Sequence, residues 1–288
     1  MHLVLIAHRE TETNLRLVEA APRGVEMSIA GPAKSLNLIG PGDAALGRLD
    51  VLPTVDGIER GMWEIARLAA EGLPVLNGLR TLVATHDKLQ TSRVLAAGGL
   101  PHPRTAHLLG PGTPLPLEPP VVVKPRFGSW GRDVVVCHDR AEAKVELERL
   151  AERTWFKRQG ALIQELIPPP GRDLRIVVAA GAVVGAIQRI AAPGEWRTNV
   201  ALGGVRRQVS PPAAARELAL AAARAAEADF VGVDLLPTPE GGWVVLELNG
   251  AVEFTDEYSL DRDVFAAASE ALVAAASRPG RERLAALA

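Results

Sequence analysis

The fold of this 288-residue chain is indicated first by the stretch Val121-Val-Val-Lys124-Pro-Arg-Phe-Gly128-Ser129-Trp130-Gly131-Arg132. An apolar strand ends at a lysine and enters a short Gly/Ser loop, and a second apolar run, Val134–Val136, follows directly. Glycines remove the side chains that would block close approach, so the N–H groups of such a loop can close over a polyphosphate. The lysine adds a positive charge at the strand end. We therefore predict a phosphate-binding loop, different from the Walker motif because the lysine precedes the loop and a strand follows it.

A second pair of apolar runs lies further along the chain. Val231–Leu236 and Trp243–Asn249 flank a turn rich in proline and glycine, which predicts a β-hairpin. If the turn is centred on Glu240-Gly241, Asp234 and Glu247 lie directly opposite each other in the hairpin.

The oxygen-bearing side chains of this hairpin are expected to share one face. Side chains alternate between faces along a strand, so Glu247 and Asn249 point to the same side, and Asp234 joins them from the opposite strand. Two carboxylates placed opposite each other are unfavourable unless a positive charge lies between them. Mg²⁺ suits this gap because it prefers oxygen ligands and is often shared between carboxylates and nucleotide phosphates. The alternative is a solvated hairpin face with incidental acids.

The composition is that of an ordinary globular protein, with 48% hydrophobic residues, 23% charged residues and a formal net charge of −2. This balance predicts neither a nucleic-acid nor a membrane partner. A single cysteine, Cys137, excludes an internal disulfide framework and a multi-cysteine zinc site. No apolar stretch approaches a membrane span, and Met1–Ala7 resembles a first strand more than a signal peptide. We expect a cytoplasmic protein.

The order of patterns predicts three lobes. Residues 1–84 alternate strand-like and helix-like segments, as in a small α/β lobe, and carry no dinucleotide-binding fingerprint after the first strand. Residues 85–167 form a central lobe with the phosphate loop, in which Thr85 is expected to cap a helix ending near Ala97. Residues 168–288 form a C-terminal lobe with the acidic hairpin.

The chemistry-bearing residues follow one another in an order typical of a known family. The residues that carry this order are Lys88, Lys124, Gln164–Ile167, Gly171–Arg175, Arg197–Asn199, Gly203-Gly204, Asp234 and Leu246–Asn249. The chain resembles the ATP-grasp carboxylate–amine ligases of the RimK type. The loop Gly128–Arg132 and the pair Glu253-Phe254 are most similar to LysX-like enzymes, which join an amino acid to the terminal glutamate of a small carrier protein.

The resemblance implies an α/β (α+β) ATP-grasp fold, with an N-terminal α/β lobe and two further lobes that hold ATP between antiparallel sheets. It also implies an ADP-forming ligase that uses ATP and Mg²⁺, or Mn²⁺ in its place. A glutamyl-type carboxylate would be phosphorylated, and an amino-acid amine would attack the resulting acyl phosphate to form an amide. Such a reaction depends on positioning and on charge neutralisation.

Carried over position by position, the resemblance assigns roles to residues of this chain. Arg189 would stabilise the transferring phosphoryl group, the backbone of Glu165 and Leu166 would contact the adenine edge, and Glu165 or Asp173 would accept from the ribose hydroxyls. The catalytic candidates are Arg189, Arg175 and Lys124; the nucleotide-binding candidates are Lys88, Lys124, Gly128, Ser129, Trp130, Gly131, Glu165, Leu166, Asp173, Arg197, Thr198 and Asn199; the metal candidates are Asp234, Glu247 and Asn249.

Several of these residues have a plainer interpretation. Arg175 and Asp173 lie two positions apart and could form a local salt bridge, and Lys88 could be a solvated helix residue. Trp130 could act as a lid or pack under its loop. In the first lobe, Arg48 and Arg60 could bind a substrate carboxylate or lie on the surface.

The acceptor and the amino acid are left open by the sequence. The segment Gly250–Phe254 matches the LysX-like pattern only at its end, and it borders the expected amino-acid pocket. The partners considered are an amino acid with a small acidic carrier protein or peptide, in a chain expected to form a homo-oligomer. The alternatives are a RimK-like glutamate ligase that acts on a protein tail or peptide, and a nucleotide-binding module without catalysis.

Overall fold

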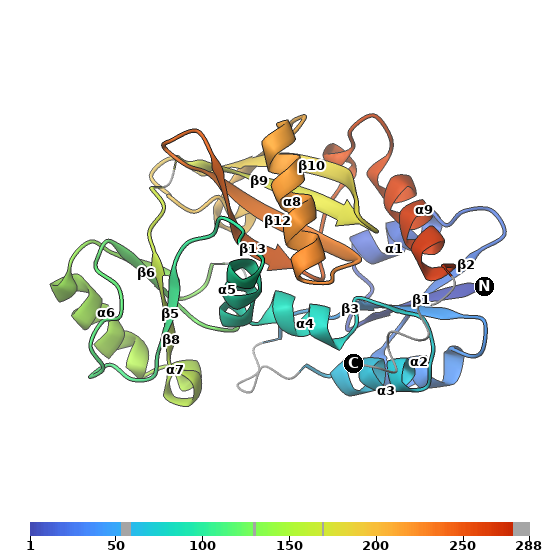
Figure 1. Cartoon of the computed structure of the whole chain (residues 1–288), viewed down its shortest axis with the longest axis horizontal. Coiled ribbons are helices and arrows are strands. Elements are labelled where there is room, and N and C mark those ends of the chain that lie inside the picture. The colour runs from blue at the N-terminus through green and yellow to red at the C-terminus, as the bar shows by residue number, and fades with distance from the viewer. Residues whose placement is uncertain (53–58, 129–130, 169, 279–288) are drawn as a thin grey trace.

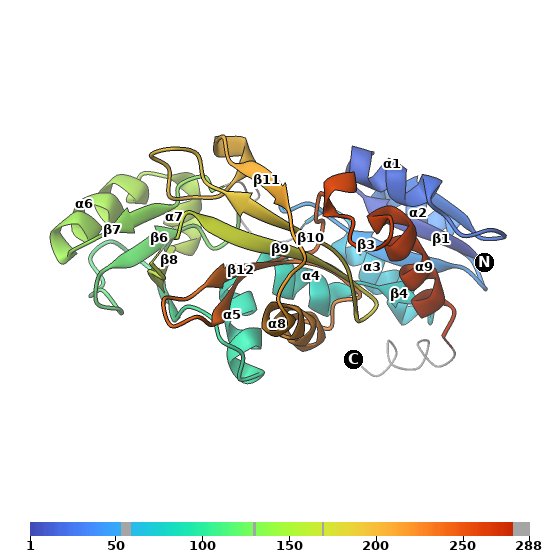
Figure 2. The same ribbon diagram turned by 90° about the horizontal axis from the view of Figure 1, so that it is seen from above.

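The computed structural model describes residues 1–52, 59–128, 131–168 and 170–278. Three sheets follow one another along the long axis of the molecule (Figures 1 and 2). The sheet of the N-terminal part is parallel. The other two are antiparallel, as the resemblance to ATP-grasp ligases implies. Each sheet falls within one of the three predicted ranges, and we keep those ranges as proposed lobe boundaries.

The first sheet has the strand order β2-β1-β3-β4. Its strands are β1 (His2–Ala7), β2 (Glu26–Ala30), β3 (Ala44–Arg48) and β4 (Val75–Leu76). One face is covered by α1 (Glu12–Glu19) and α9 (Val264–Ala276), and the other by α2 (Pro32–Leu38) and α3 (Met62–Ala70). The sheet strands are apolar on both faces, which is usual where helices cover both sides of a parallel sheet.

The second sheet has the order β5-β8-β6-β7. Its strands are β5 (Thr105–Leu108), β6 (Val121–Lys124), β7 (Val135–Cys137) and β8 (Ala161–Glu165). Alternate residues such as Val121, Val123 and Ile163 pack under α6 (Arg140–Ala151) and α7 (Thr154–Gln159). Because side chains alternate, Lys124 and Gln164 lie on the opposite face of this sheet.

The third sheet has the order β11-β10-β9-β12-β13. Its strands are β9 (Arg172–Ala179), β10 (Ala182–Ile190), β11 (Val205–Gln208), β12 (Phe230–Pro237) and β13 (Trp243–Asn249). The alanine-rich helix α8 (Ala213–Ala225) packs on one face through small side chains, which let the helix approach the sheet closely. The predicted hairpins β9–β10 and β12–β13 both form.

The other face of the third sheet changes character along its length. At one end, Val177 and Phe230 join the core shared with α9 and the first sheet. At the other end the same face carries charged residues, among them Arg189 and Asp234. The apolar end of the third sheet thus packs against α9 and the first sheet, and its charged end faces the second sheet.

Two expectations about helices are wrong. Thr85 does not cap a helix: it lies inside α4 (Leu79–His86), and its hydroxyl donates to the carbonyl of Thr81 at 2.9 Å. Asp87 caps the next helix, α5 (Lys88–Ala97), by accepting from the backbone N–H of Leu89 at 3.0 Å. The second concerns the polar stretch of residues 141 to 158: its pattern predicts one helix, but the structure divides it into α6 and α7.

Across the residues that the structure describes, none of the helices has both the length and the apolar character needed to cross a membrane.

Candidate active site

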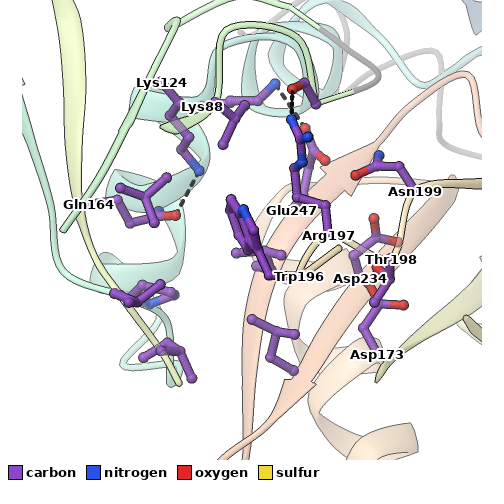
Figure 3. Close-up of a pocket in the computed structure, with 18 of the residues that line it drawn as sticks. Lys88, Lys124, Gln164, Asp173, Trp196, Arg197, Thr198, Asn199, Asp234 and Glu247 are labelled. Carbon is purple, nitrogen blue, oxygen red and sulfur yellow. Dashed lines mark hydrogen bonds and ion pairs between the residues drawn. The ribbon is translucent and has the colours of Figure 1, made fainter. Parts of the chain in front are cut away.

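The phosphate-loop unit and the acidic hairpin line one cavity between the second and third sheets (Figure 3). The cavity holds about 990 Å³ of empty space, its open mouth included. Lys124 and Gly128 line it from the side of the second sheet, and Asp234 and Glu247 line it from the third. The sequence therefore predicted correctly that two elements a hundred residues apart face each other.

Lys88 connects these two elements. It is the first residue of α5, placed there by the cap of Asp87. Its ammonium group donates to the carbonyl of Gly128 at 2.5 Å and forms an ion pair with Glu247 at 2.8 Å. Lys88 is thus part of the cavity wall, and the interpretation as a solvated helix residue is wrong.

Lys124 lies deeper, at the end of β6, with 7% of its surface exposed. Its ammonium group donates to the side-chain oxygen of Gln164 on the neighbouring strand at 2.7 Å. Burial, with a smaller contribution from Lys88, lowers the pKa of Lys124 from 10.5 to about 8. A nearby anion would favour its charged form.

A row of ion pairs crosses the charged end of the third sheet. Arg189 makes a two-point contact with Asp173, its neighbour in the ladder, at 2.8 and 2.5 Å. The same guanidinium reaches Asp234 at 2.9 Å, and Arg175 holds Asp234 by two further bonds at 2.7 and 2.8 Å. Arg175 is therefore paired with Asp234 on the neighbouring strand. The alternative interpretation, a local salt bridge between Arg175 and Asp173, is wrong.

The charges in this row stabilise one another. Burial alone would raise the pKa of Asp234, but Arg175 and Arg189 lower it to about 2. Burial alone would lower the pKa of Arg189, but Asp234 and Asp173 raise it above its ordinary value. Asp234 and Arg189 therefore stay ionised at neutral pH, and two carboxylates fix the orientation of Arg189.

The metal candidates have the predicted register. Asp234 is directly opposite Glu247 in the hairpin, and a bulge follows Asp234. Asn249 lies opposite Gly232, outside the cavity lining, and its buried amide nitrogen has no hydrogen-bond partner within the described part of the chain. Rotating the amide by half a turn would put its oxygen in that position.

The donor set fits a divalent cation of the hard type. It offers two carboxylates and one amide oxygen, and oxygen ligands of this kind suit Mg²⁺ and Mn²⁺. Among the described residues, no group of three or more His, Cys, Asp or Glu side chains gathers as a metal site. A cation held here would therefore need further ligands from phosphate or water.

The segment between β10 and β11 lines the cavity beside the phosphate loop. Arg197 is held by Glu195 at 2.8 Å and donates to the carbonyl of Gly131 at 3.0 Å. Thr198 donates to Asp173 at 2.6 Å, so the segment is tied to the ion-pair row. Asn199 approaches Gly131, where a Cβ atom would lie 3.2 Å from its side-chain oxygen. These contacts bring the predicted residues 197–199 beside the loop.

Of the remaining nucleotide-binding candidates, some line the cavity and others lie outside the described residues. Glu165 and Leu166 line the cavity at the end of β8, but the Glu165 carboxylate is paired with Arg104 at 3.1 Å. Asp173 is also paired, with Arg189. Both candidates for accepting from the ribose hydroxyls are therefore already paired with an arginine. Ser129 and Trp130 lie outside the described residues.

Two cavity residues were not identified from the sequence. Gln164 was quoted only as part of a strand motif, although its alternation with Lys124 across the ladder could have placed both on one face. Trp196 lies between the two sheets in Figure 3, and no signal in the sequence distinguishes it from an ordinary core aromatic residue.

The arginines of the first lobe have different environments. Arg48 is almost completely buried and donates to Asn14 at 2.6 Å and to the carbonyl of Val252 at 3.0 Å. Both expected positions of Arg48, on the surface or beside a substrate carboxylate, are therefore wrong. Its guanidinium instead joins the first sheet to the segment after β13. Arg60 is exposed.

Comparisons with known proteins agree with this geometry. The RimK-like ATP-grasp domain matches residues 85–269. The chain is 32% identical over 219 residues to the glutamate–LysW ligase ArgX of Sulfurisphaera tokodaii, covering 74% of this chain and 78% of that protein. It is also 32% identical over 187 residues to the α-aminoadipate–LysW ligase LysX of Saccharolobus solfataricus, covering 64% and 68%.

The fold has close counterparts among solved structures. A RimK domain ATP-grasp protein of Sphaerobacter thermophilus superposes with a TM-score of 0.67 at 25% identity, covering 95% of this chain and 100% of that one. The ATP complex of D-alanine–D-alanine ligase from Bacillus anthracis gives 0.69 at 17% identity, covering 98% and 99%, which supports the fold alone. The expected ATP-grasp architecture is thus confirmed, and this chain belongs to the RimK-like ATP-grasp family of ATP-dependent ligases.

Proposed function

We propose that this enzyme joins the amine of an amino acid to a glutamyl-type carboxylate through an acyl phosphate, with release of ADP. The observation that carries the proposal is the single cavity in which Lys88 touches both Gly128 of the phosphate loop and Glu247 of the acidic hairpin. The curated relatives named above are ligases that attach glutamate or α-aminoadipate to LysW. We infer the same reaction class here, and a cytoplasmic location suits it.

The nucleotide would occupy this cavity along its length. Val122, Leu236 and Leu246 offer an apolar slot between the sheets, suited to the faces of an adenine ring. Lys88, Lys124 and the glycines of the loop lie toward the charged end, where the phosphates would be neutralised. The whole site thus combines an apolar base pocket with a cationic phosphate end.

Asp234, Glu247 and Asn249 would hold one or two divalent cations, most simply Mg²⁺. When bound, such a cation would supply positive charge that neutralises the charge developing during phosphoryl transfer. The protein's own contribution is to keep both carboxylates ionised, which Lys88, Arg175 and Arg189 do by lowering the pKa of Glu247 and Asp234.

Arg189 is the residue we assign to the transferring phosphoryl group. A carboxylate oxygen of the acceptor attacks the γ-phosphorus, the bond to the β,γ-bridging oxygen breaks, and ADP leaves. The amine, in its neutral form, then attacks the acyl carbon and loses a proton, and inorganic phosphate leaves with the electron pair of the C–O bond. Arg189 is held rigidly by Asp173 and Asp234, so it can stabilise charge on the phosphoryl oxygens without rearranging.

The pH dependence of nucleotide affinity is a consequence of the position of Lys124. Its pKa of about 8 in the free enzyme should rise when polyphosphate binds, because an anion favours the charged ammonium. ATP affinity should therefore be constant below pH 8 and fall as the pH rises above it, by at most about tenfold per pH unit, with proton uptake on binding. Titration calorimetry in two buffers of different ionisation enthalpy measures this uptake. In Lys124→Arg the fall above pH 8 should disappear; a wild-type affinity that is flat to pH 9.5 would contradict the assignment.

The acceptor is inferred from the names of the relatives. LysW in the relatives' names is a carrier, and we propose a carrier with a glutamyl end for this chain as well. Other relatives act on different acceptors, such as the tetrahydromethanopterin:α-L-glutamate ligase of Methanosarcina acetivorans, 30% identical over 233 residues. A RimK-like glutamate ligase that acts on a peptide or protein tail is therefore the second candidate.

An assay of ADP release distinguishes these possibilities. Sustained ADP release is expected only when ATP, a divalent cation, a carboxylate acceptor and an amine are all present. A panel of amino acids, tested with and without acceptors ending in glutamate, separates the carrier from the peptide or small-molecule acceptor. ATP binding with no turnover stimulated by any substrate pair would instead favour a nucleotide-binding module.

A further inference from the structure

A third arginine extends the ion-pair row toward the edge of the third sheet. Arg206 of β11 lies directly opposite Arg189 of β10 in the ladder, so both side chains emerge on the same face. Arg189 in turn shares Asp234 with Arg175. Like charges directly opposite each other in a sheet are destabilising unless an anion compensates them. Asp173 and Asp234 compensate Arg189 and Arg175, but neither is paired with Arg206.

Arg206 itself has only a weak counter-ion. In the part of the chain that the structure describes, its one ion pair is with Glu257, at 3.7 Å. This distance is beyond hydrogen-bonding range, and the side chains of Arg206 and Glu257 are 32% and 57% exposed. The planar fork of donors on Arg206 is therefore available to a carboxylate from outside.

The position of Arg206 relative to the cavity indicates which molecule would meet it. Asp173, Arg189 and Asp234 form the charged end of the nucleotide cavity, and Arg206 is not among the residues that line it. It lies one strand further, roughly 5 Å beyond Arg189. Burial raises the pKa of the Tyr258 hydroxyl, while Arg175, Arg189 and Arg206 all lower it, so all three guanidinium groups lie near enough to act on this hydroxyl.

This region is open to an extended chain end. All four residues of β11 are exposed, and β11 is the edge strand of its sheet. Gln208 at its end donates to the carbonyl of Ser259 at 2.9 Å, which holds β11 against the segment that contains Glu257 and Tyr258. An acceptor carboxylate placed near Arg189 would lie one strand away from this exposed edge.

We propose that Arg206 binds the second, non-reacting carboxylate of a glutamyl chain end and so determines the preference for acceptors with two carboxylates. The inference rests on the proposed ligase function and names a specificity residue for it. In a glutamyl end the two carboxyl carbons are separated by three carbons, a span of roughly 5 Å when extended. That span matches the step between the strands of Arg189 and Arg206. One carboxylate is phosphorylated beside Arg189, and the other keeps its charge and pairs with Arg206.

The test combines a protein change with a substrate change. An acceptor that supports turnover is prepared with a free glutamyl end and as each of its two monoamides; the monoamide that still reacts lacks only the non-reacting charge. We compare the wild type with Arg206→Gln and with Arg207→Gln, the matched control. Arg207 is the next residue of the same exposed strand, pairs with Gln188, and points to the other face.

The proposed contact between Arg206 and the non-reacting carboxylate predicts the following results. Wild-type kcat/KM should be about tenfold or more higher for the diacid than for the reactive monoamide, as for a lost charge-assisted hydrogen bond. Arg206→Gln should lower kcat/KM for the diacid by the same factor, through the KM of the acceptor, and leave the monoamide unaffected. The KM values for ATP and for the amino acid should not change, and Arg207→Gln should behave as the wild type.

Other outcomes overturn the inference. An equal loss for diacid and monoamide in Arg206→Gln would assign the residue a general structural role. A higher KM for the amino acid would mean that Arg206 binds the carboxylate of the amine substrate, and a loss of equal size in Arg207→Gln would indicate an unspecific effect of charge. If the wild type ligates no glutamyl acceptor at all, the proposed function fails and the inference fails with it, a result distinct from active enzyme without discrimination.

Discussion

Replacing Glu247 by glutamine is expected to lower substrate-dependent ADP release by about a thousandfold, the upper range for the loss of one electrostatic contact in a transition state. The substitution keeps the shape of the side chain and removes one of the two carboxylates that face each other in the acidic hairpin. A cation would lose a charged ligand, and Lys88 would lose its partner at 2.8 Å. Initial rates of ADP formation at saturating ATP and over a wide range of Mg²⁺ concentrations measure the effect.

A matched control is available in the same hairpin. Glu240 lies exposed in the turn between β12 and β13, and Glu240→Gln removes an equal charge from a residue that does not line the cavity. This variant should retain wild-type rates. If Glu247→Gln is as active as Glu240→Gln at every metal concentration, the proposed metal site is wrong.

Arg189→Met is the second substitution with a large expected effect, because it removes both the proposed phosphoryl contact and a buried charge. Asp173 and Asp234 are 2% and 3% exposed, and each would lose a strong hydrogen bond. Breaking a buried ion pair from one side typically costs about 3–5 kcal/mol, so the free energy of unfolding should fall by an amount of that order. Activity should fall by about a hundredfold to a thousandfold even where the variant is fully folded.

Two further variants separate the stability effect from the catalytic one. Arg189→Lys keeps a charge but cannot form the two-point contact with Asp173, so it should recover part of the stability and little of the activity. Arg216→Met, on the exposed surface of α8, is the control for loss of an arginine and should change neither quantity. Denaturant titration without ATP measures the free energy of unfolding, and single-turnover ADP formation measures the catalytic effect. Wild-type single-turnover rates in folded Arg189→Met would refute the role assigned to Arg189.

The acidic hairpin shows what local pattern can predict. Its two apolar runs and the Pro/Gly turn between them predict the hairpin, and Asp234 was placed opposite Glu247 correctly. The pairs nearest the turn, from Leu235 with Val245 to Pro237 with Trp243, are centred on Glu240, and the bulge between Asp234 and Leu235 shifts the register by one residue to give this pair. The fold class and the family followed from the order of short motifs along the chain.

The pairing of Arg175 could not be predicted in the same way. Its partner Asp234 is on β12, which is adjacent to β9 in the sheet but separated from it in sequence by β10, β11 and α8. The local alternative, Asp173, was closer in sequence and is occupied by Arg189 instead. Sheet order is a property of the whole lobe, and the apolar pattern of one strand does not contain it.

Burial from distant segments explains the other differences. Arg48 ends a strand of the first sheet, and Asn14 of α1 and the segment around Val252 bury it. Gly250 is needed where that segment passes α4, because a Cβ atom there would lie 2.7 Å from the hydroxyl of Thr85. The residues between Gly250 and Phe254 are thus selected in part by packing against the first lobe, which is a physical reason for their departure from the expected pattern.

The central claim, that the acceptor carboxylate is activated by transfer of the γ-phosphoryl group, is tested most directly by isotope transfer. The reacting carboxylate of the acceptor is labelled with ¹⁸O in both oxygens, and the products are analysed by mass spectrometry after limited turnover. The account predicts that each released phosphate carries one ¹⁸O atom and that the nucleotide product is unlabelled ADP. Unlabelled phosphate, or label in AMP, would contradict an acyl phosphate and with it the role assigned to this cavity.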